Sequence, residues 1–158
     1  MKTITIQSVA QTEICSLFTI SAEGEAMSEL EKFIVNNSQT YSTELNIILG
    51  AINRMLTSSG FLERYFRPEG KMSDHVCALP IQSGKLRLYC LRMNDSILIV
   101  GNGGVKDSKR YQDCPELNGY VVDLQQLDKA LRFAIKRGDV TIEERTINGI
   151  EDTKFEIQ

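Results

Sequence analysis

The residues of this 158-residue sequence that could do chemistry are mainly cations, and they gather in its middle third. Residues 54–110 carry ten Lys and Arg against five Asp and Glu, a net charge of +5, whereas the rest of the chain carries −8. Arginine binds phosphate oxygens with a planar, permanently charged fork, and lysine adds a point charge. A basic face of this kind favours an anionic ligand, although a mixed solvated surface explains the same counts.

Most of these cations lie around two predicted strands in the centre of the chain. Apolar and polar residues that alternate over 86–91 predict a half-buried strand, and the apolar run 97–100 predicts a second strand covered on both faces. A tight turn at Asn94-Asp95 is expected to join them, because Asn and Asp tolerate a positive φ. Arg87 and Arg92 are an odd number of positions apart, so a regular strand points them to opposite sides.

A glycine-rich stretch follows the second strand. The strand is expected to end at Gly101-Asn-Gly-Gly104, and a basic loop then runs from Lys106 to Arg110. The glycines lack the spacing of a dinucleotide-binding or Walker motif, and no helix obviously starts directly after them. They favour a bulge or a turn with positive φ. A small nucleotide-binding domain that uses these glycines is an alternative interpretation.

The cations around the two central strands suit cleavage of RNA without a metal ion. Cations stabilise the charge that develops on the phosphate, while another group moves the 2′-OH proton. Upstream, Phe61 to Arg67 interleaves aromatic and basic residues, a pattern that stacks on nucleic acid but also serves ordinary amphipathic packing. The residues of the central cluster are Arg87, Arg92, Lys106, Lys109 and Arg110, with Tyr89 and Tyr111 near them in sequence.

Other site chemistries find little support. The one histidine, His75, has no ligand partner at i+3 or i+4, and the four cysteines show no CxxC spacing, so no metal site is expected. No sequence pattern calls for a cofactor either. A Ser-His-Asp or Cys-His centre would need the same histidine, and no nucleophile-elbow sequence accompanies it. His75 is therefore expected to be a surface or hydrogen-bonded side chain.

The periodicity of the chain predicts a single α+β domain over residues 1–158. The expected elements of the N-terminal part are a hairpin of strands over 3–9 and 14–21, a helix capped by Ser28 with Glu31, and a helix whose apolar stripe runs from Tyr41 to Leu56 before Gly60. The expected elements of the rest are a strand over 76–81, the two central strands, a helix capped by Asp123 with Gln126 that stops at Gly138, and a hairpin of strands over 140–147 and 153–157 around Asn148-Gly149. The fold class is a mainly antiparallel sheet with two N-terminal helices and one C-terminal helix packed on it, and extra terminal hairpins.

No apolar run approaches the length of a membrane span, and the first residues lack the apolar core of a signal peptide. The cysteines lie mostly in or beside apolar runs, which favours reduced thiols in the core. The sequence thus predicts a cytoplasmic protein without a membrane partner.

The order of elements and the central motif resemble those of the RelE/HigB-like toxins of bacterial type II toxin–antitoxin systems. In that family two helices are followed by a strand that leads into a hairpin. The first hairpin strand carries Tyr and Arg, and the second is apolar. A turn followed by Lys then leads to a last helix. The segments that carry the resemblance are Lys85-Leu-Arg-Leu-Tyr89, Ile97 to Val100 and Gly103-Gly-Val-Lys106, within residues 14–137. Extra strands over 3–21 and 140–157 extend this region at both ends.

The resemblance implies metal-independent cleavage of mRNA, either free or on the ribosome, controlled by an antitoxin protein. It assigns catalysis to three residues: Arg87 is similar to the family's phosphate-contacting arginine, Lys106 to the lysine after the last strand, and Tyr111 to a residue that positions groups or transfers a proton. The residues expected to bind RNA are Arg64, Arg67, Lys85, Lys109 and Arg110.

Two departures from the family pattern keep a second interpretation open. The strand before the hairpin reads Val76-Cys-Ala-Leu-Pro80, where many members carry basic residues, and the net charge is −3. The alternative is a non-catalytic protein of the same fold that binds a partner or forms a homo-oligomer.

Overall fold

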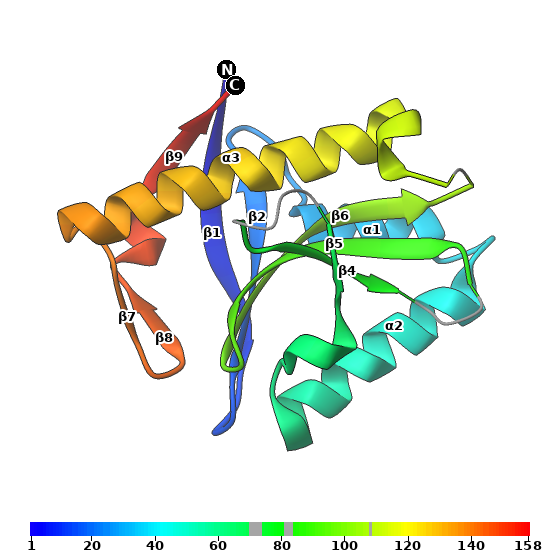
Figure 1. Ribbon diagram of the computed structural model, residues 1–158, viewed down its shortest axis with the longest axis horizontal. Coiled ribbons are helices and arrows are strands. Elements are labelled where there is room, and N and C mark those ends of the chain that lie inside the picture. The colour runs from blue at the N-terminus through cyan, green and yellow to red at the C-terminus, as the bar shows by residue number, and fades with distance from the viewer. Residues whose placement is uncertain (70–73, 81–83, 108) are drawn as a thin grey trace.

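The computed structural model describes residues 1–69, 74–80, 84–107 and 109–158, and it has the predicted α+β class (Figure 1). A seven-stranded sheet has the order β3-β4-β5-β6-β2-β1-β9, and β7 with β8 forms a separate hairpin. The strands are β1 (Lys2–Gln11), β2 (Ser16–Ala22), β3 (Arg67–Pro68), β4 (Val76–Pro80), β5 (Leu86–Asn94), β6 (Ile97–Val105), β7 (Thr141–Glu143), β8 (Thr146–Asn148) and β9 (Lys154–Ile157). The main helices are α1 (Glu29–Asn37), α2 (Ser42–Arg54) and α3 (Pro115–Arg137).

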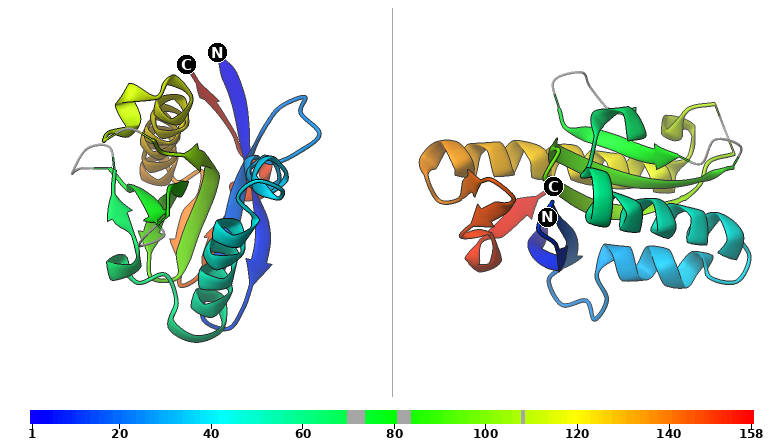
Figure 2. Two further views of the ribbon diagram at one scale, coloured as in Figure 1. Left: turned by 90° about the vertical axis from the view of Figure 1, so that its right-hand side faces the viewer. Right: turned by 90° about the horizontal axis from the view of Figure 1, so that it is seen from below.

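Helices cover both faces of the sheet. Figure 2 shows α1 and α2 on one side of it and α3 on the other. Because side chains alternate between the two faces of a strand, β6 contributes to the hydrophobic core on each face of the sheet. Leu98 and Val100 pack with α1 and α2, whereas Ile97 and Ile99 pack with α3. This explains the continuous apolar run of β6, because a central strand covered on both faces has no polar side.

The N-terminal elements confirm the sequence prediction closely. β1 and β2 pair as an antiparallel hairpin, although the turn lies at Thr12 to Cys15. Ser28 accepts a hydrogen bond from the Glu31 amide, and Glu31 accepts one from the Ser28 amide, so the capping box is present. After α2 a single π turn, Met55–Ser59, leads to Gly60, whose φ of 79° ends the helical run.

The central hairpin of β5 and β6 is confirmed, with two corrections. Its turn residues are Asp95 and Ser96, and neither Asn94 nor Asp95 has a positive φ; the Asn94 side chain accepts a hydrogen bond from the Ser96 amide instead. β6 also continues through the glycines to Val105 and does not end there. A bulge opposite Tyr89 accommodates them, since Leu88 pairs with Gly103 and Cys90 with Val100.

The C-terminal predictions need more correction. α3 begins at Pro115, well before the predicted cap at Asp123, because proline suits the first turn of a helix. Gly138 ends it as predicted, with a φ of 86°. The hairpin around Asn148-Gly149 is wrong: β7 pairs with β8, and β9 pairs with β1 at the edge of the main sheet.

Two further differences concern β3 and β4. The two residues of β3 were not predicted as a strand, and they add an edge strand beside β4. β4 ends at Pro80, and the predicted last residue, Ile81, lies outside the described residues. Within the described ranges, no helix is long and apolar enough to cross a membrane.

Candidate functional site

The strand register brings the two principal cations of the sequence prediction to one face of the sheet. Arg87 of β5 pairs with Gly104 of β6. Lys106 lies two positions after Gly104, and its amide donates to the carbonyl of Lys85. Opposite partners in an antiparallel pair share a face, and so do residues two apart. Leu86 and Val105, between them, pack on the α2 side. Arg87 and Lys106 therefore both lie on the α3 face.

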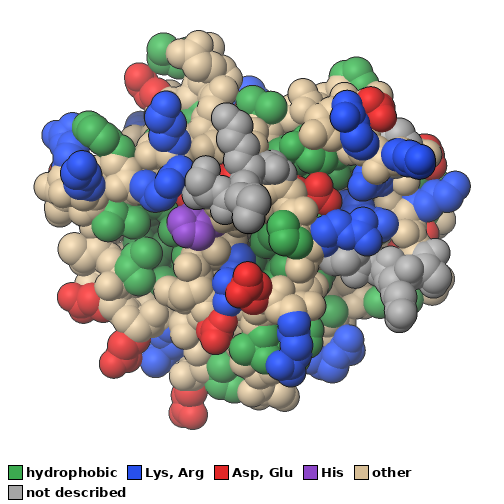
Figure 3. Space-filling model, viewed as in Figure 1, with side chains coloured by type: hydrophobic (Ala, Val, Ile, Leu, Met, Phe, Trp, Pro, Cys, Tyr) green, Lys and Arg blue, Asp and Glu red, His purple; other side chains and the backbone are tan. Residues whose placement is uncertain are grey.

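A third cation and a carboxylate join them from the edge of the sheet. Arg67 pairs with Ala78, which belongs to the core under α3, and the Glu69 amide donates to the Val76 carbonyl. Arg67 and Glu69 consequently share the face of Arg87. We call Arg67, Glu69, Arg87 and Lys106 the basic cluster. Figure 3 shows Lys and Arg side chains gathered on the right-hand side of the molecule, where β6 runs toward α3.

The Glu69 carboxyl is half-buried among the three cations. Burial raises its pKa above the ordinary value, whereas the positive charges of Lys106, Arg67 and Arg87 act in the opposite direction. Burial also lowers the pKa of the Arg87 guanidinium, and the neighbouring Arg67 adds to the decrease. Burial outweighs the charges at Glu69, so this carboxyl takes up a proton more readily than an exposed glutamate.

Several buried polar atoms of this region lack partners. Among the residues that the structure describes, Glu69 Oε1, Arg87 Nε and the Tyr89 hydroxyl have no hydrogen-bond partner. Burying an unpaired polar group costs about 1–3 kcal/mol. Three such groups within one neighbourhood are consistent with a site whose hydrogen bonds are completed by a ligand.

Backbone contacts hold Arg87 in place. Its Nη1 donates to the carbonyls of Gly84 at 2.9 Å and Leu86 at 3.0 Å. Across the strand pair, a Cβ on Gly103 would lie 1.9 Å from the Arg87 carbonyl oxygen. Close backbone approach therefore requires glycine at position 103, directly beside the predicted bulge.

Two buried tyrosines pack beside the basic cluster. Tyr89 is fully buried, and burial with the nearby Glu69 charge raises its pKa. Tyr111 packs edge-on against it, with ring centroids 6.3 Å apart. Tyr111 has 9% of its surface exposed, so this predicted catalytic residue lies mainly inside the core.

The other residues predicted to bind RNA do not gather at the basic cluster. Arg64 lies over the ring of Tyr65, which packs on the α2-side core, away from the basic cluster. Lys85 is exposed and faces Asp107 at 3.6 Å. Lys109 and Arg110 are exposed in the loop before α3, where Arg110 is 3.8 Å from Asp113.

Arg92 faces away from Arg87, as the odd spacing predicted. Its Nε donates to the carbonyl of Phe61, a residue of the core under α2, at 2.7 Å. Arg92 also pairs with Asp95 beside the hairpin turn. Of the two strand arginines, only Arg87 belongs to the basic cluster.

Sequence reasoning missed two acidic residues. Nothing in the sequence distinguishes Glu69, because its position depends on the two-residue strand β3. Asp128 carried a signal, since a charged residue interrupts the apolar stripe of α3. It is fully buried, and its carboxylate binds His75 Nδ1 at 2.7 Å and lies 3.4 Å from Arg132 Nε. His75 is thus the hydrogen-bonded histidine that was expected.

The comparisons leave the family open. Comparison with models of known protein families, with curated proteins and with solved structures finds no match to this chain. Within the part of the chain that the structure describes, no group of three or more His, Cys, Asp or Glu could hold a metal ion. The chemistry of the site thus has to be argued from the basic cluster itself.

Proposed function

We propose that this protein binds RNA at the basic cluster and cleaves it, as the resemblance to RelE/HigB-like toxins implies. The observation that carries the proposal is the register of β3, β5 and β6, which gathers three cations around one half-buried carboxyl. Arginine and lysine at this spacing suit a phosphate group, and Glu69 supplies a proton acceptor that the sequence did not suggest.

The proposed reaction is attack of the ribose 2′-oxygen on the adjacent phosphorus. Glu69 accepts the 2′-OH proton, and its raised pKa makes it a stronger base than an ordinary glutamate. Arg87 and Lys106 stabilise the negative charge on the phosphate oxygens. The bond to the 5′-oxygen breaks, and Lys106 donates the proton that this oxygen takes up. The products are a 2′,3′-cyclic phosphate and a 5′-hydroxyl.

Induced expression and assays with purified protein test the proposal. The wild-type protein should arrest growth and cleave RNA in the presence of ribosomes, and Arg87→Ala should abolish both. Glu69→Gln should lower the cleavage rate by about 10²–10⁴-fold, the usual contribution of a general base. Cleavage by the wild type should also fall as the pH drops through the raised pKa of Glu69.

Arg64→Ala is the matched control, because it removes a surface arginine on the other side of the sheet. It should leave cleavage unchanged. A wild-type protein that neither arrests growth nor cleaves RNA with ribosomes would refute the proposal, provided that circular dichroism shows it folded.

A second candidate function, partner binding without catalysis, is favoured by an apolar surface between α3 and β9. Phe133 is 60% exposed there, beside a groove of about 830 Å³ that Ala130 and Ile157 also line. Lys129, Arg132 and Lys136 surround the groove. A second copy of this surface would bring like charges together, so the groove favours an acidic partner protein over self-association.

Co-expression with the product of the adjacent reading frame tests this candidate, because antitoxin genes neighbour their toxins in the family that the chain resembles. If that product is an acidic partner, the two proteins should elute together, and Phe133→Asp should separate them. Co-elution that persists in Phe133→Asp would exclude the groove as the contact surface. Glu13→Ala, an exposed change elsewhere, serves as the control.

A further inference from the structure

The main sheet forks between its two adjacent parallel strands. β2 pairs with β6 only from Ser16 to Thr19, opposite Ile97 to Val100. Beyond this point β2 continues along β1, whereas β6 enters its bulge and continues along β5. The helices that follow go to opposite faces, α1 after β2 and α3 after β6 (Figure 2). Ligands of open sheets bind at such switch points, beyond the carboxyl ends of the strands.

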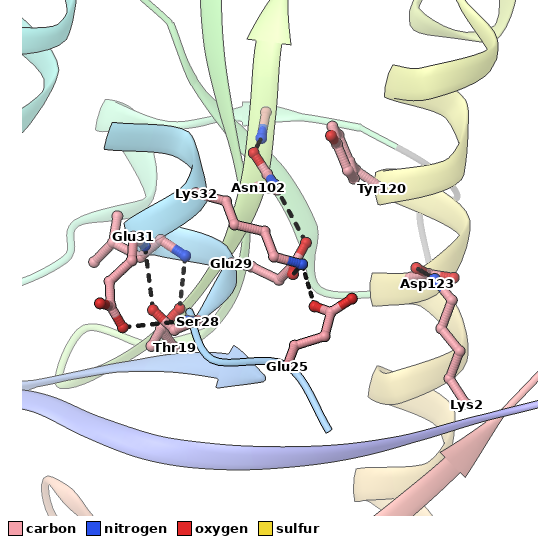
Figure 4. Close-up of polar contacts among 12 residues, drawn as sticks. Lys2, Thr19, Glu25, Ser28, Glu29, Glu31, Lys32, Asn102, Tyr120 and Asp123 are labelled. Carbon is pink, nitrogen blue, oxygen red and sulfur yellow. Dashed lines mark hydrogen bonds and ion pairs between the residues drawn. The ribbon is translucent and has the colours of Figure 1, made fainter. Parts of the chain in front are cut away.

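Two buried polar side chains hold the fork open (Figure 4). The Thr19 hydroxyl donates to the Val100 carbonyl at 2.9 Å and accepts from the Leu30 amide, so it ties the start of α1 to the last paired residue. Asn102, at 4% exposure, accepts from the Gly103 amide through its side-chain oxygen, and its Nδ2 donates to Glu29 at 3.3 Å. These bonds fix Glu29 at the mouth of the fork.

A cavity of about 670 Å³ fills the space beyond the fork. This size lies within the range of pockets that enclose small molecules. One wall is apolar, formed by Ile4, Ile20 and Leu124, and the Tyr120 ring lies beside it. The opposite wall is formed by Glu29 and Lys32 of α1 and by Glu25 in the loop before this helix.

The charges at the cavity favour a cation. Four carboxylates line it, from Glu23, Glu25, Glu29 and Asp123, against the two lysines Lys2 and Lys32. Lys2 binds Asp123 at 2.7 Å, and Lys154, outside the cavity lining, lies 3.5 Å from Glu23. Glu25 and Glu29 share the single cation Lys32, so the excess of negative charge is confined to this pair. The N-terminus of α1 offers no site for an anion, because Thr19 and the capping box already occupy its first amides.

We propose that this cavity binds a small organic cation, an amine or guanidine on a short apolar body. The cationic group pairs with the Glu29 carboxylate, which Asn102 holds in place, and the apolar body packs between Leu124, Ile20 and the Tyr120 ring. This site is independent of the basic cluster and of RNA cleavage.

Calorimetric titration of the full chain with tyramine, agmatine and spermidine tests the proposal, with N-acetyltyramine as the uncharged counterpart of tyramine. At least one amine should bind saturably, whereas N-acetyltyramine, phosphate and citrate should not. Glu29→Gln keeps a hydrogen-bond acceptor for Asn102 but removes the charge, and it should weaken binding at least about tenfold, or 1.4 kcal/mol. Ala22→Trp fills the cavity without a charge change and should do the same.

Glu13→Gln controls for general attraction to an acidic protein, because Glu13 is exposed and does not line the cavity. It should bind amines as the wild type does. Thermal unfolding without ligand establishes that each variant folds. Absence of saturable amine binding by the wild type would overturn the proposal. Binding that is unaffected in Ala22→Trp, or weakened equally in Glu13→Gln, would overturn it as well.

Discussion

Only glycine fits at position 103, because the backbone of the neighbouring strand passes too close for a Cβ atom. Gly103→Ala should lower the free energy of unfolding by about 2–3 kcal/mol, because its Cβ would collide with the Arg87 carbonyl 1.9 Å away and force the bulge apart. Urea unfolding monitored by circular dichroism measures the change. Gly119→Ala, in α3 with nothing within 4 Å of the added Cβ, should instead be neutral or stabilise by up to about 1 kcal/mol. Equal effects of the two substitutions would contradict the steric argument.

His75 should make stability depend on pH. The hydrogen bond to Asp128 raises its pKa above the ordinary 6.5, although partial burial acts in the opposite direction. A group whose pKa is higher in the folded state stabilises fully below its unfolded pKa, and the contribution is lost as the pH rises through the folded pKa. The free energy of unfolding of the wild type should therefore decline as the pH rises from about 6.5 through that value.

Two measurements check the histidine prediction. NMR titration of the single histidine gives its pKa directly, without overlap. The decline in stability should disappear in His75→Gln, and a decline of the same size in that variant would assign it to other groups.

At the residue scale, the sequence indicated Arg87 and Lys106 as candidate residues, but only the register of β5 and β6 shows that both lie on one face of the sheet. The sequence could not identify Glu69, since β3 contributes only two residues and has no periodicity to read. It also contained no sign that Tyr111 is mostly buried, because the packing of this residue against the ring of Tyr89 depends on the tertiary structure.

Among the elements, α1 depends on its cap. Ser28→Ala should lower the free energy of unfolding by about 1 kcal/mol, because the Glu31 amide loses its acceptor. Ser42→Ala, in the first turn of α2, is the matched control, since Ser42 is not that helix's cap residue. Thermal or urea unfolding of both variants measures the difference. A similar loss in Ser42→Ala would show that the effect is not due to capping.

Elements were predictable where local signals determine them. Capping box, apolar stripe and terminating glycine together predicted α1 and α2 with small errors at the boundaries. The start of α3 was misplaced because Asp123 and Gln126 imitate a cap, while Pro115 is the actual first residue. Asn148-Gly149 imitates a hairpin turn in the same way, although Gly149 with a φ of 87° leads into a 3₁₀ turn, Ile150–Asp152.

For the whole molecule, the pairing of β9 with β1 is a contact that the sequence could not predict, because no local pattern specifies a partner so distant in the chain. Phe155 pairs with Ile4 and is buried under α3. Phe155→Ala should lower the free energy of unfolding by about 3–5 kcal/mol through the lost burial and the cavity left behind. Its exposed neighbour Glu156→Ala should change stability by less than about 0.5 kcal/mol. Comparable losses in both would refute a specific role for Phe155.

The same pairing constrains the order of events during synthesis. β1 leaves the ribosome before the other strands of the sheet and β9 after them, and Lys2 to Thr5 pair at this edge with Lys154 to Ile157. Until then, the outer edge of β1 presents unpaired backbone groups to any other strand in reach. The nascent chain is consequently most exposed to association with other chains in the interval between folding of its centre and synthesis of β9.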